Sequence, residues 1–162
     1  MNAFVFWQRW LLIVGFILIL FGVVMALLNG TVVFALFNSQ IDPVFWGAAG
    51  VPADAARFQQ WIYGVLGATV AGWGVFLAFI AHYPFKAKER WSRNCVVAGL
   101  LLWYVLDTAI SLYFGVYFNA LFNTILLALA IPPLAFTWKH FAQTGLEKAT
   151  ETGLEKATDV HR

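Results

Sequence analysis

Charge is almost absent from the longest stretches of this chain. Charged residues make up 11% of its 162 residues, whereas they make up about a quarter of a typical soluble domain. Hydrophobic residues account for 62%, which is more apolar side chain than a soluble domain of this size can bury. The composition therefore excludes an ordinary soluble domain and predicts an integral membrane protein in contact with the lipid bilayer. The net charge of +2 gives no indication of nucleic acid binding.

Cysteine is also nearly absent, and so are clusters of acidic or histidine side chains. The single Cys95 excludes an intramolecular disulfide framework and any chemistry that needs a cysteine pair. Membrane enzymes that transfer phosphoryl groups need several carboxylates to hold a metal ion, and the apolar stretches contain only one. His82 and His140 have no partner one helical turn away. The sequence thus predicts no cofactor and no metal, and it does not favour an enzyme.

Four stretches are long enough to cross the hydrocarbon core, which takes roughly 20 helical residues. They cover residues 10–28, 61–81, 95–118 and 120–138. We therefore expect an all-α integral membrane protein, a bundle of four transmembrane helices formed by residues 1–142. Residues 143–162 should form a solvated tail. This tail contains a direct repeat, TGLEKATE followed by TGLEKATD, whose glycines argue against a stable helix.

The positions of lysine and arginine predict the orientation, because cytoplasmic flanks retain these residues. Of the 10 Lys and Arg residues, only Arg57 falls on the opposite side of the predicted spans from the others. The sequence therefore predicts that both termini and the loop between the second and third spans face the cytoplasm. The expected location is the inner membrane of a bacterium.

The connection over residues 29–60 is much longer than a hairpin needs, and about half of it is apolar. Asp42 followed by Pro43 is typical of a helix start, and so is the region of Pro52. We expect one or two short interfacial helices in this extracytoplasmic loop. They would form either a structural lid over the bundle or a surface for gating or partner docking.

Small residues predict where the helices pack. In lipid, helices associate through close backbone approach, so small residues at a spacing of four mark a contact face. The second span has such a series in Gly64, Ala68 and Gly72, and it should be central. The predicted packing residues are Gly22, Gly64, Ala68, Gly72, Gly99 and Gly115. Pro132 and Pro133 should kink the fourth span and free backbone carbonyls one turn earlier.

Asp107 is the only charged side chain within the four predicted spans. An ionisable group at such a depth is costly unless it is satisfied, so it is a candidate functional residue. Thr69 lies at a similar depth, and Ser111 and Tyr104 lie on or near the same helical face. The candidate ligand-binding or ion-binding residues are Asp107, Thr69, Tyr104, Ser111 and Asn123. Asp107 is either a neutral structural hydrogen-bond donor, a proton-binding or cation-binding carboxylate, or a catalytic acid.

Two functional hypotheses of different class follow. The first is a non-catalytic accessory subunit, or a scaffold that binds a small ligand or lipid, built around the polar stripe at Asp107. The second is a proton-linked or cation-linked carrier or channel that uses Asp107. Four helices are few for a private pathway, so the second hypothesis requires a homo-oligomer or a larger membrane complex.

Overall fold

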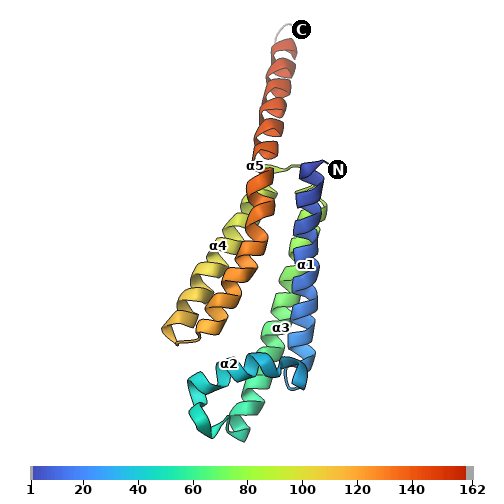
Figure 1. Cartoon of the computed structure of the whole chain (residues 1–162). Helices are drawn as coiled ribbons and strands as arrows, with labels where there is room; N and C mark the ends of the chain where they lie inside the picture. Colours follow the sequence, from blue (N-terminus) through green and yellow to red (C-terminus); the bar gives the residue numbers. More distant parts are fainter. Residues whose placement is uncertain (1, 160–162) are drawn as a thin grey trace.

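The computed structural model describes the backbone of residues 2–159 and the side chains of residues 2–141. Every regular element among these residues is a helix (Figure 1). In chain order they are α1 (Ala3–Leu28), the 3-10 helix η1 (Val32–Phe34), α2 (Ala35–Trp46), the 3-10 helix η2 (Gly47–Ala49), α3 (Ala53–His82), α4 (Arg90–Tyr113) and α5 (Tyr117–Asp159). By length and composition, α1, α3, α4 and the part of α5 up to Phe141 can each cross a membrane. The prediction of an all-helical chain with four long apolar helices is confirmed.

The third long helix ends earlier than the predicted span of 95–118. α4 stops at Tyr113 because Gly115 adopts a left-handed backbone with φ of 75°. The N–H of Gly115 donates to the carbonyl of Leu112 over 3.1 Å, and that of Val116 donates to Ser111 over 2.8 Å. This is the Schellman arrangement, which ends a helix at a glycine. Gly115 was predicted to pack helices, and the structure instead places it in this turn.

α5 also differs from the expectation, because its helix continues through the duplicated octapeptide to Asp159. A glycine inside a helix costs only about 1 kcal/mol relative to alanine, and the neighbouring Leu, Glu, Lys and Ala favour helix. The side chains of residues 142–162 lie outside the part of the chain that the structure describes. The solvated character of this tail stays a prediction.

α1 and α3 form the most intimate pair in the molecule and run antiparallel (Figure 1). Their glycines let the two backbones touch: a Cβ added to Gly22 would lie 2.6 Å from the carbonyl oxygen of Gly67. A Cβ on Gly74 would lie 2.6 Å from the backbone nitrogen of Ile19. Such a contact tolerates no side chain, as expected for helices that associate by backbone approach.

The contact face of α3 is therefore displaced from the predicted series. Gly67, Gly74 and Ala78 are buried, whereas Ala68 is exposed. A Cβ on Gly64 would meet only one atom, at 3.7 Å, and a Cβ on Gly72 or Gly99 would meet nothing within 4 Å. The second span does pack through small residues. Within one chain, however, the residues in contact are displaced along α3 by about three positions from the predicted series.

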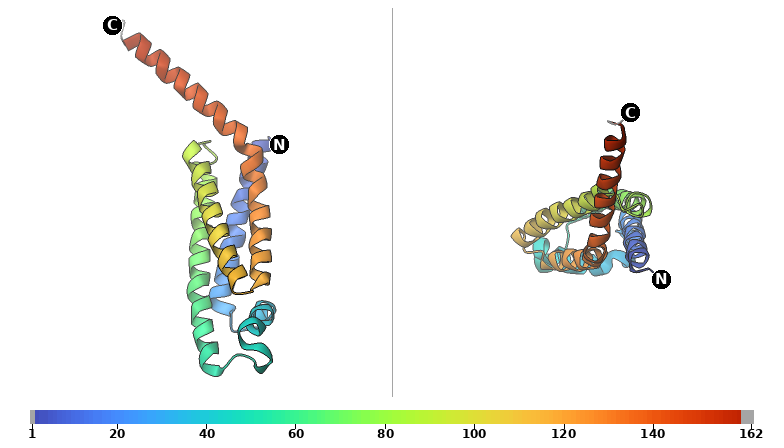
Figure 2. Two further views of the ribbon diagram at one scale, coloured as in Figure 1. Left: turned by 90° about the vertical axis from the view of Figure 1, so that its left-hand side faces the viewer. Right: turned by 90° about the horizontal axis from the view of Figure 1, so that it is seen from above.

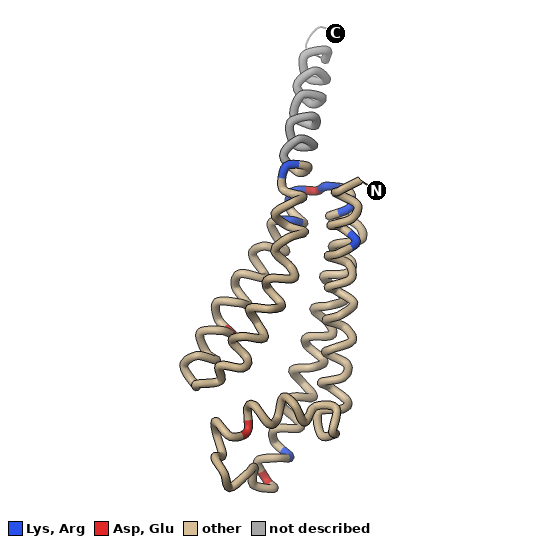
Figure 3. Tube along the Cα trace, viewed as in Figure 1, with Lys and Arg blue, Asp and Glu red and all other residues tan. Residues whose placement is uncertain are grey.

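The other two long helices form a second antiparallel pair, α4 with α5, which is joined to the first pair mainly through α1 and α5. The contacts therefore run from α3 to α1, to α5 and to α4, with few between α3 and α4. Figure 2 shows the four long helices from a second side and from above. At one end, the rings of Phe4, Phe85 and Phe141 join α1, the loop after α3, and α5, with centroids 4.8–6.1 Å apart. Most lysines and arginines also lie at this end, which we call the basic end (Figure 3).

The proline pair of α5 frees a carbonyl one turn earlier, as predicted. Pro133 has no N–H to offer the carbonyl of Leu129, four residues before it. The indole N–H of Trp10 donates to this carbonyl oxygen over 2.9 Å. The break in α5 thus serves the contact with α1, which Trp7 extends by stacking on Phe136 with ring centroids 4.9 Å apart.

The long connection forms one short α-helix, α2, with the 3-10 helices η1 and η2 directly before and after it, and α2 begins at Ala35 rather than at Asp42. Pro43 lies inside α2, four residues from its end. Phe37 of α2 packs on Phe21 of α1 and on Phe122 of α5, with ring centroids 5.7 and 5.3 Å apart. This long-range aromatic packing determines where α2 begins. The local capping pattern of Asp42 and Pro43 carries no information about such packing. The second predicted start is correct, because Pro52 precedes the first residue of α3.

Candidate functional site at Asp107

Asp107 lies on α4, two turns before the Schellman turn. Helical spacing places Trp103 one turn before it and Ser111 one turn after it. The turn at residues 114–116 then reverses the chain, so that Asn119 and Asn123 on the first turns of α5 face the same region. Polar side chains that are close in sequence are thereby gathered around one carboxylate.

The carboxylate of Asp107 accepts four side-chain hydrogen bonds. Its Oδ1 accepts from Asn119 Nδ2 at 2.7 Å, from Asn123 Nδ2 at 2.9 Å and from Ser111 Oγ at 3.2 Å. Its Oδ2 accepts from Trp103 Nε1 at 3.2 Å. The two asparagines come from the opposite helix, so the carboxylate connects α4 to α5. We call Asp107, Trp103, Ser111, Asn119 and Asn123 the Asp107 cluster.

The cluster is linked internally as well. Asn119 Nδ2 donates to Ser111 Oγ over 2.8 Å. The single hydrogen of the Ser111 hydroxyl is shared between Oδ1 and the backbone carbonyl of Asp107, and the carbonyl is the nearer of the two at 2.7 Å. Asn123 and Ser111 are buried, with exposed fractions of 2% and 6%, whereas Asp107 and Asn119 are half-buried. A buried amide that donates to a carboxylate is well satisfied, and removal of that carboxylate would leave it without its acceptor.

In this cluster the carboxylate accepts hydrogen bonds, and the groups around it supply the donors. Indole and amide N–H groups can only donate, and a carboxylate accepts most strongly from such groups. A metal or alkali cation would need several oxygen ligands directed at one point. Within the described residues, the nitrogen donors of three side chains point at the carboxylate, and no group of three His, Cys, Asp or Glu side chains could hold a metal ion.

Two of the predicted partners lie elsewhere. Thr69 is exposed on α3 and donates to the carbonyl of Val65 over 3.0 Å. Tyr104 forms a hydrogen bond with Thr124 over 3.2 Å, on a neighbouring face of the α4 and α5 pair. Ser111 and Asn123 are the predicted residues that the structure brings to Asp107.

Asn119 and Trp103 were not among the predicted site residues. Asn119 follows the turn directly, where the interpretation as a turn residue is the ordinary one. A signal existed in the spacing about Gly115: Ser111 and Asn119 each lie four residues from it, and Asp107 and Asn123 each lie eight residues from it. Such symmetry about a turn glycine places the members of each pair opposite one another in a helical hairpin.

Comparisons with known proteins found no match: no family model, no curated protein and no solved structure matches this chain.

Proposed function

We propose that the protein is a non-catalytic scaffold of the membrane, an accessory protein or a binder of lipid or another small ligand, in which the Asp107 cluster locks α4 to α5. The observation that carries the proposal is the set of four donors around the carboxylate, all from its own helical hairpin. A carboxylate used in this way holds a hairpin together and needs no transported ion.

The surface of α4 supports a scaffolding role. The apolar stretch of α4 is less buried within the molecule than the corresponding stretch of each of the other three long helices. Leu102, Val105 and Ile110 are more than half exposed, and they form an apolar face that α3 does not cover. In the proposed setting this face contacts lipid or the helix of a partner membrane protein, which includes a second copy of this chain.

The proposed orientation places the basic end in the cytoplasm of a bacterium and α2 at the outer surface of its inner membrane. The distribution of lysine and arginine supports this, since cytoplasmic flanks retain these residues. Phe37 of α2 packs on Phe21 of α1, and Phe34 of η1 packs on Tyr63 of α3, with ring centroids 5.7 and 5.6 Å apart. This anchoring supports the role of a fixed lid.

The test compares the wild type with Asp107→Asn in proteoliposomes and in detergent. The scaffold predicts no proton or monovalent cation flux under an imposed gradient for either protein, and a lower unfolding temperature for the variant. A flux that depends on the gradient in the wild type and is lost in a stably folded Asp107→Asn variant would instead establish the oligomeric carrier or channel. Tyr104→Phe is the matched control, because Tyr104 lies on the same helix but outside the Asp107 cluster.

A further inference from the structure

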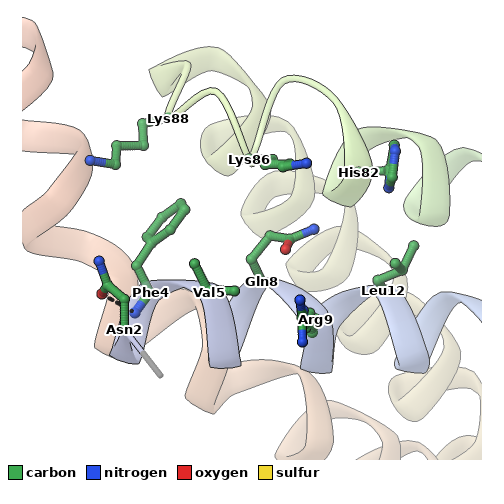
Figure 4. Close-up of a pocket in the computed structure, with 9 residues that line it drawn as sticks. All are labelled: Asn2, Phe4, Val5, Gln8, Arg9, Leu12, His82, Lys86 and Lys88. Atoms are coloured by element: carbon green, nitrogen blue, oxygen red, sulfur yellow. Dashed lines mark hydrogen bonds between the residues drawn. The ribbon is translucent and has the colours of Figure 1, made fainter.

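A cavity of about 440 Å³ lies at the basic end, between the first turns of α1 and the loop that follows α3 (Figure 4). Its lining is divided by chemistry: Phe4, Val5 and Leu12 are apolar, whereas Arg9, Lys86 and Lys88 are cationic. The volume falls within the usual range for small-ligand pockets, about 300–1,000 Å³.

The cations around this cavity have no anionic partner. No described carboxylate forms an ion pair with Arg9, Lys86 or Lys88, and no acidic side chain lines the cavity. Glu89 follows Lys88 directly in the sequence, and its carboxylate accepts a hydrogen bond from the indole of Trp91. Lys88 instead lies over the ring of Phe4, with its Nζ 5.5 Å from the centroid. Among the residues whose side chains the structure describes, none supplies a carboxylate to pair with the three positive charges of this site.

The framework of the cavity is fixed. Gln8 Nε2 donates to the carbonyl of Ala81 over 2.9 Å, which ties the wall on α1 to the end of α3. Gln8 is buried, with an exposed fraction of 5%, and Phe4 is packed in the aromatic contact with Phe85. The general tendency of cytoplasmic flanks to carry Lys and Arg does not by itself explain this arrangement. Two segments that are far apart in sequence bring their cations to one cavity.

We propose that this cavity binds the phosphate of an anionic phospholipid headgroup. The shared chemistry is that of a phosphate anion, for which ammonium and guanidinium groups are the usual ligands. Basic pockets between membrane helices recognise lipid headgroups in this manner. The apolar part of the wall favours the lipid over free phosphate. Helical spacing places Ile13 and Phe16 one turn after Arg9 and Leu12 of the wall, and both are more than half exposed, so they can accompany an acyl chain toward the membrane interior.

The inference depends on the basic end lying at a membrane surface, and it does not depend on the role of Asp107. Asp107 lies far along α4 from this end, about 25 Å from Arg90 at 1.5 Å per residue. Variants of Asp107 that still fold should therefore bind the lipid as the wild type does. The proposal for Asp107 and the proposal for this cavity can therefore fail independently, and the experiments distinguish the two failures.

The experiment uses the full chain in a neutral detergent, with short-chain phosphatidylglycerol, short-chain phosphatidylcholine and inorganic phosphate as probes. Native mass spectrometry counts bound lipid, and thermal unfolding measures stabilisation. We expect phosphatidylglycerol to bind and to raise the unfolding temperature, and we expect the other two probes to do neither at the same concentration. Each of Arg9→Gln, Lys86→Gln and Lys88→Gln should weaken phosphatidylglycerol binding about fivefold, and Lys86→Arg should restore most of it.

The matched control is Lys139→Gln, which removes an exposed cation of the same end that does not line the cavity. It should leave lipid binding unchanged. An equal loss in Lys139→Gln and Lys86→Gln would reduce the effect to general surface charge and overturn the site. Equal stabilisation by inorganic phosphate would assign the cavity to a free anion and overturn the lipid. If Lys86→Gln unfolds, Lys86→Arg and Arg9→Gln still provide the comparison.

Discussion

Gly22 of α1 and Gly67 of α3 exclude side chains from one another reciprocally. A Cβ on Gly22 would lie 2.6 Å from the carbonyl oxygen of Gly67, and a Cβ on Gly67 would lie 2.6 Å from the carbonyl oxygen of Gly22. Real Cβ atoms do not approach backbone oxygens this closely, so one added carbon on either helix must separate the pair. The bundle depends on this crossing, because α1 is also the helix that holds α5.

Substitution at this crossing should be far more damaging than substitution at the predicted series. Gly67→Ala should destabilise the fold by about 3 kcal/mol, since overpacking a tight contact typically costs 1–3 kcal/mol or more. Gly72→Ala should be harmless or stabilising by up to about 1 kcal/mol, because a Cβ there meets nothing within 4 Å and alanine favours a helix over glycine. Thermal unfolding in detergent measures both. Equal loss in the two variants would show that Gly72 packs against a second chain.

Removal of the Asp107 carboxylate should weaken the α4 and α5 pair. Asp107→Ala leaves the buried amide of Asn123 without its acceptor, and we expect a loss of about 1–3 kcal/mol. Asp107→Asn keeps one carbonyl oxygen for the asparagines and should cost less. A double-mutant cycle between Asp107→Ala and Asn123→Ala should give a coupling of about 0.6–1.7 kcal/mol, the range seen for hydrogen bonds between membrane helices. Additive effects would contradict the observed contact.

Gly115 and Gly99 should respond in opposite ways to alanine. Gly115 has a φ of 75°, which costs an L residue about 1–2 kcal/mol, so Gly115→Ala should be destabilising. Gly99 lies in the helical part of α4 with open space around it, so Gly99→Ala should stabilise by up to about 1 kcal/mol. Chemical unfolding of the two variants in parallel tests the assignment. A stabilised Gly115→Ala protein would be incompatible with the Schellman turn.

Trp10 and Pro133 should be coupled, although they do not bond to one another. Trp10→Phe removes the donor to the carbonyl of Leu129 and should cost about 1 kcal/mol. Pro133→Ala supplies an N–H within α5 for the same carbonyl. In a Pro133→Ala background, Trp10→Phe should therefore cost measurably less. The cycle is read by thermal unfolding, and an unchanged cost would mean that Trp10 stabilises the helices by packing alone.

The two ends of the molecule should face opposite sides of the membrane. In a Cys95→Ser background, a cysteine at Lys88 should be labelled from the cytoplasmic side and a cysteine at Gly50 from the outer side. Both positions lie in connections between helices. Impermeant maleimides added to intact cells and to inverted vesicles distinguish the sides. Labelling of Lys88→Cys in intact cells would reverse the proposed orientation.

Composition and run length predicted the helical class and the four long helices, because apolar residues over roughly 20 positions leave few alternatives. The register of α3 was harder to predict. Gly64, Ala68 and Gly72 repeat every four residues, whereas the buried Gly67, Gly74 and Ala78 are spaced by seven and four, and only the partner helix decides which small residues are used. The start of α2 was also out of reach, since it depends on rings from α1 and α5.

The central residue of the site, Asp107, was predicted from the sequence, whereas some of its hydrogen-bond partners were not. Asp107 came from the rule that an ionisable group at this depth must be satisfied, and Ser111 came from its place on the same helical face. Asn123 was a candidate because it lies near the turn between the third and fourth spans. Thr69 was expected because it lies at the same depth, but depth does not determine adjacency when α3 and α4 scarcely touch. Asn119 could be found only by placing the turn at Gly115, whereas the apolar run continues to residue 118.

If the four long helices span a membrane as proposed, the symmetry of polar residues about Gly115 has a consequence for how this part of the chain is inserted during synthesis. α4 emerges from the ribosome with Asp107 still lacking Asn119 and Asn123, which follow within 16 residues. A lone α4 would expose a carboxylate to hydrocarbon, whereas the completed hairpin carries its own donors. We therefore expect α4 to wait at the insertion machinery until α5 arrives, and the two to enter as a unit. α1, whose sequence from residue 10 to 28 has no charge, can enter alone.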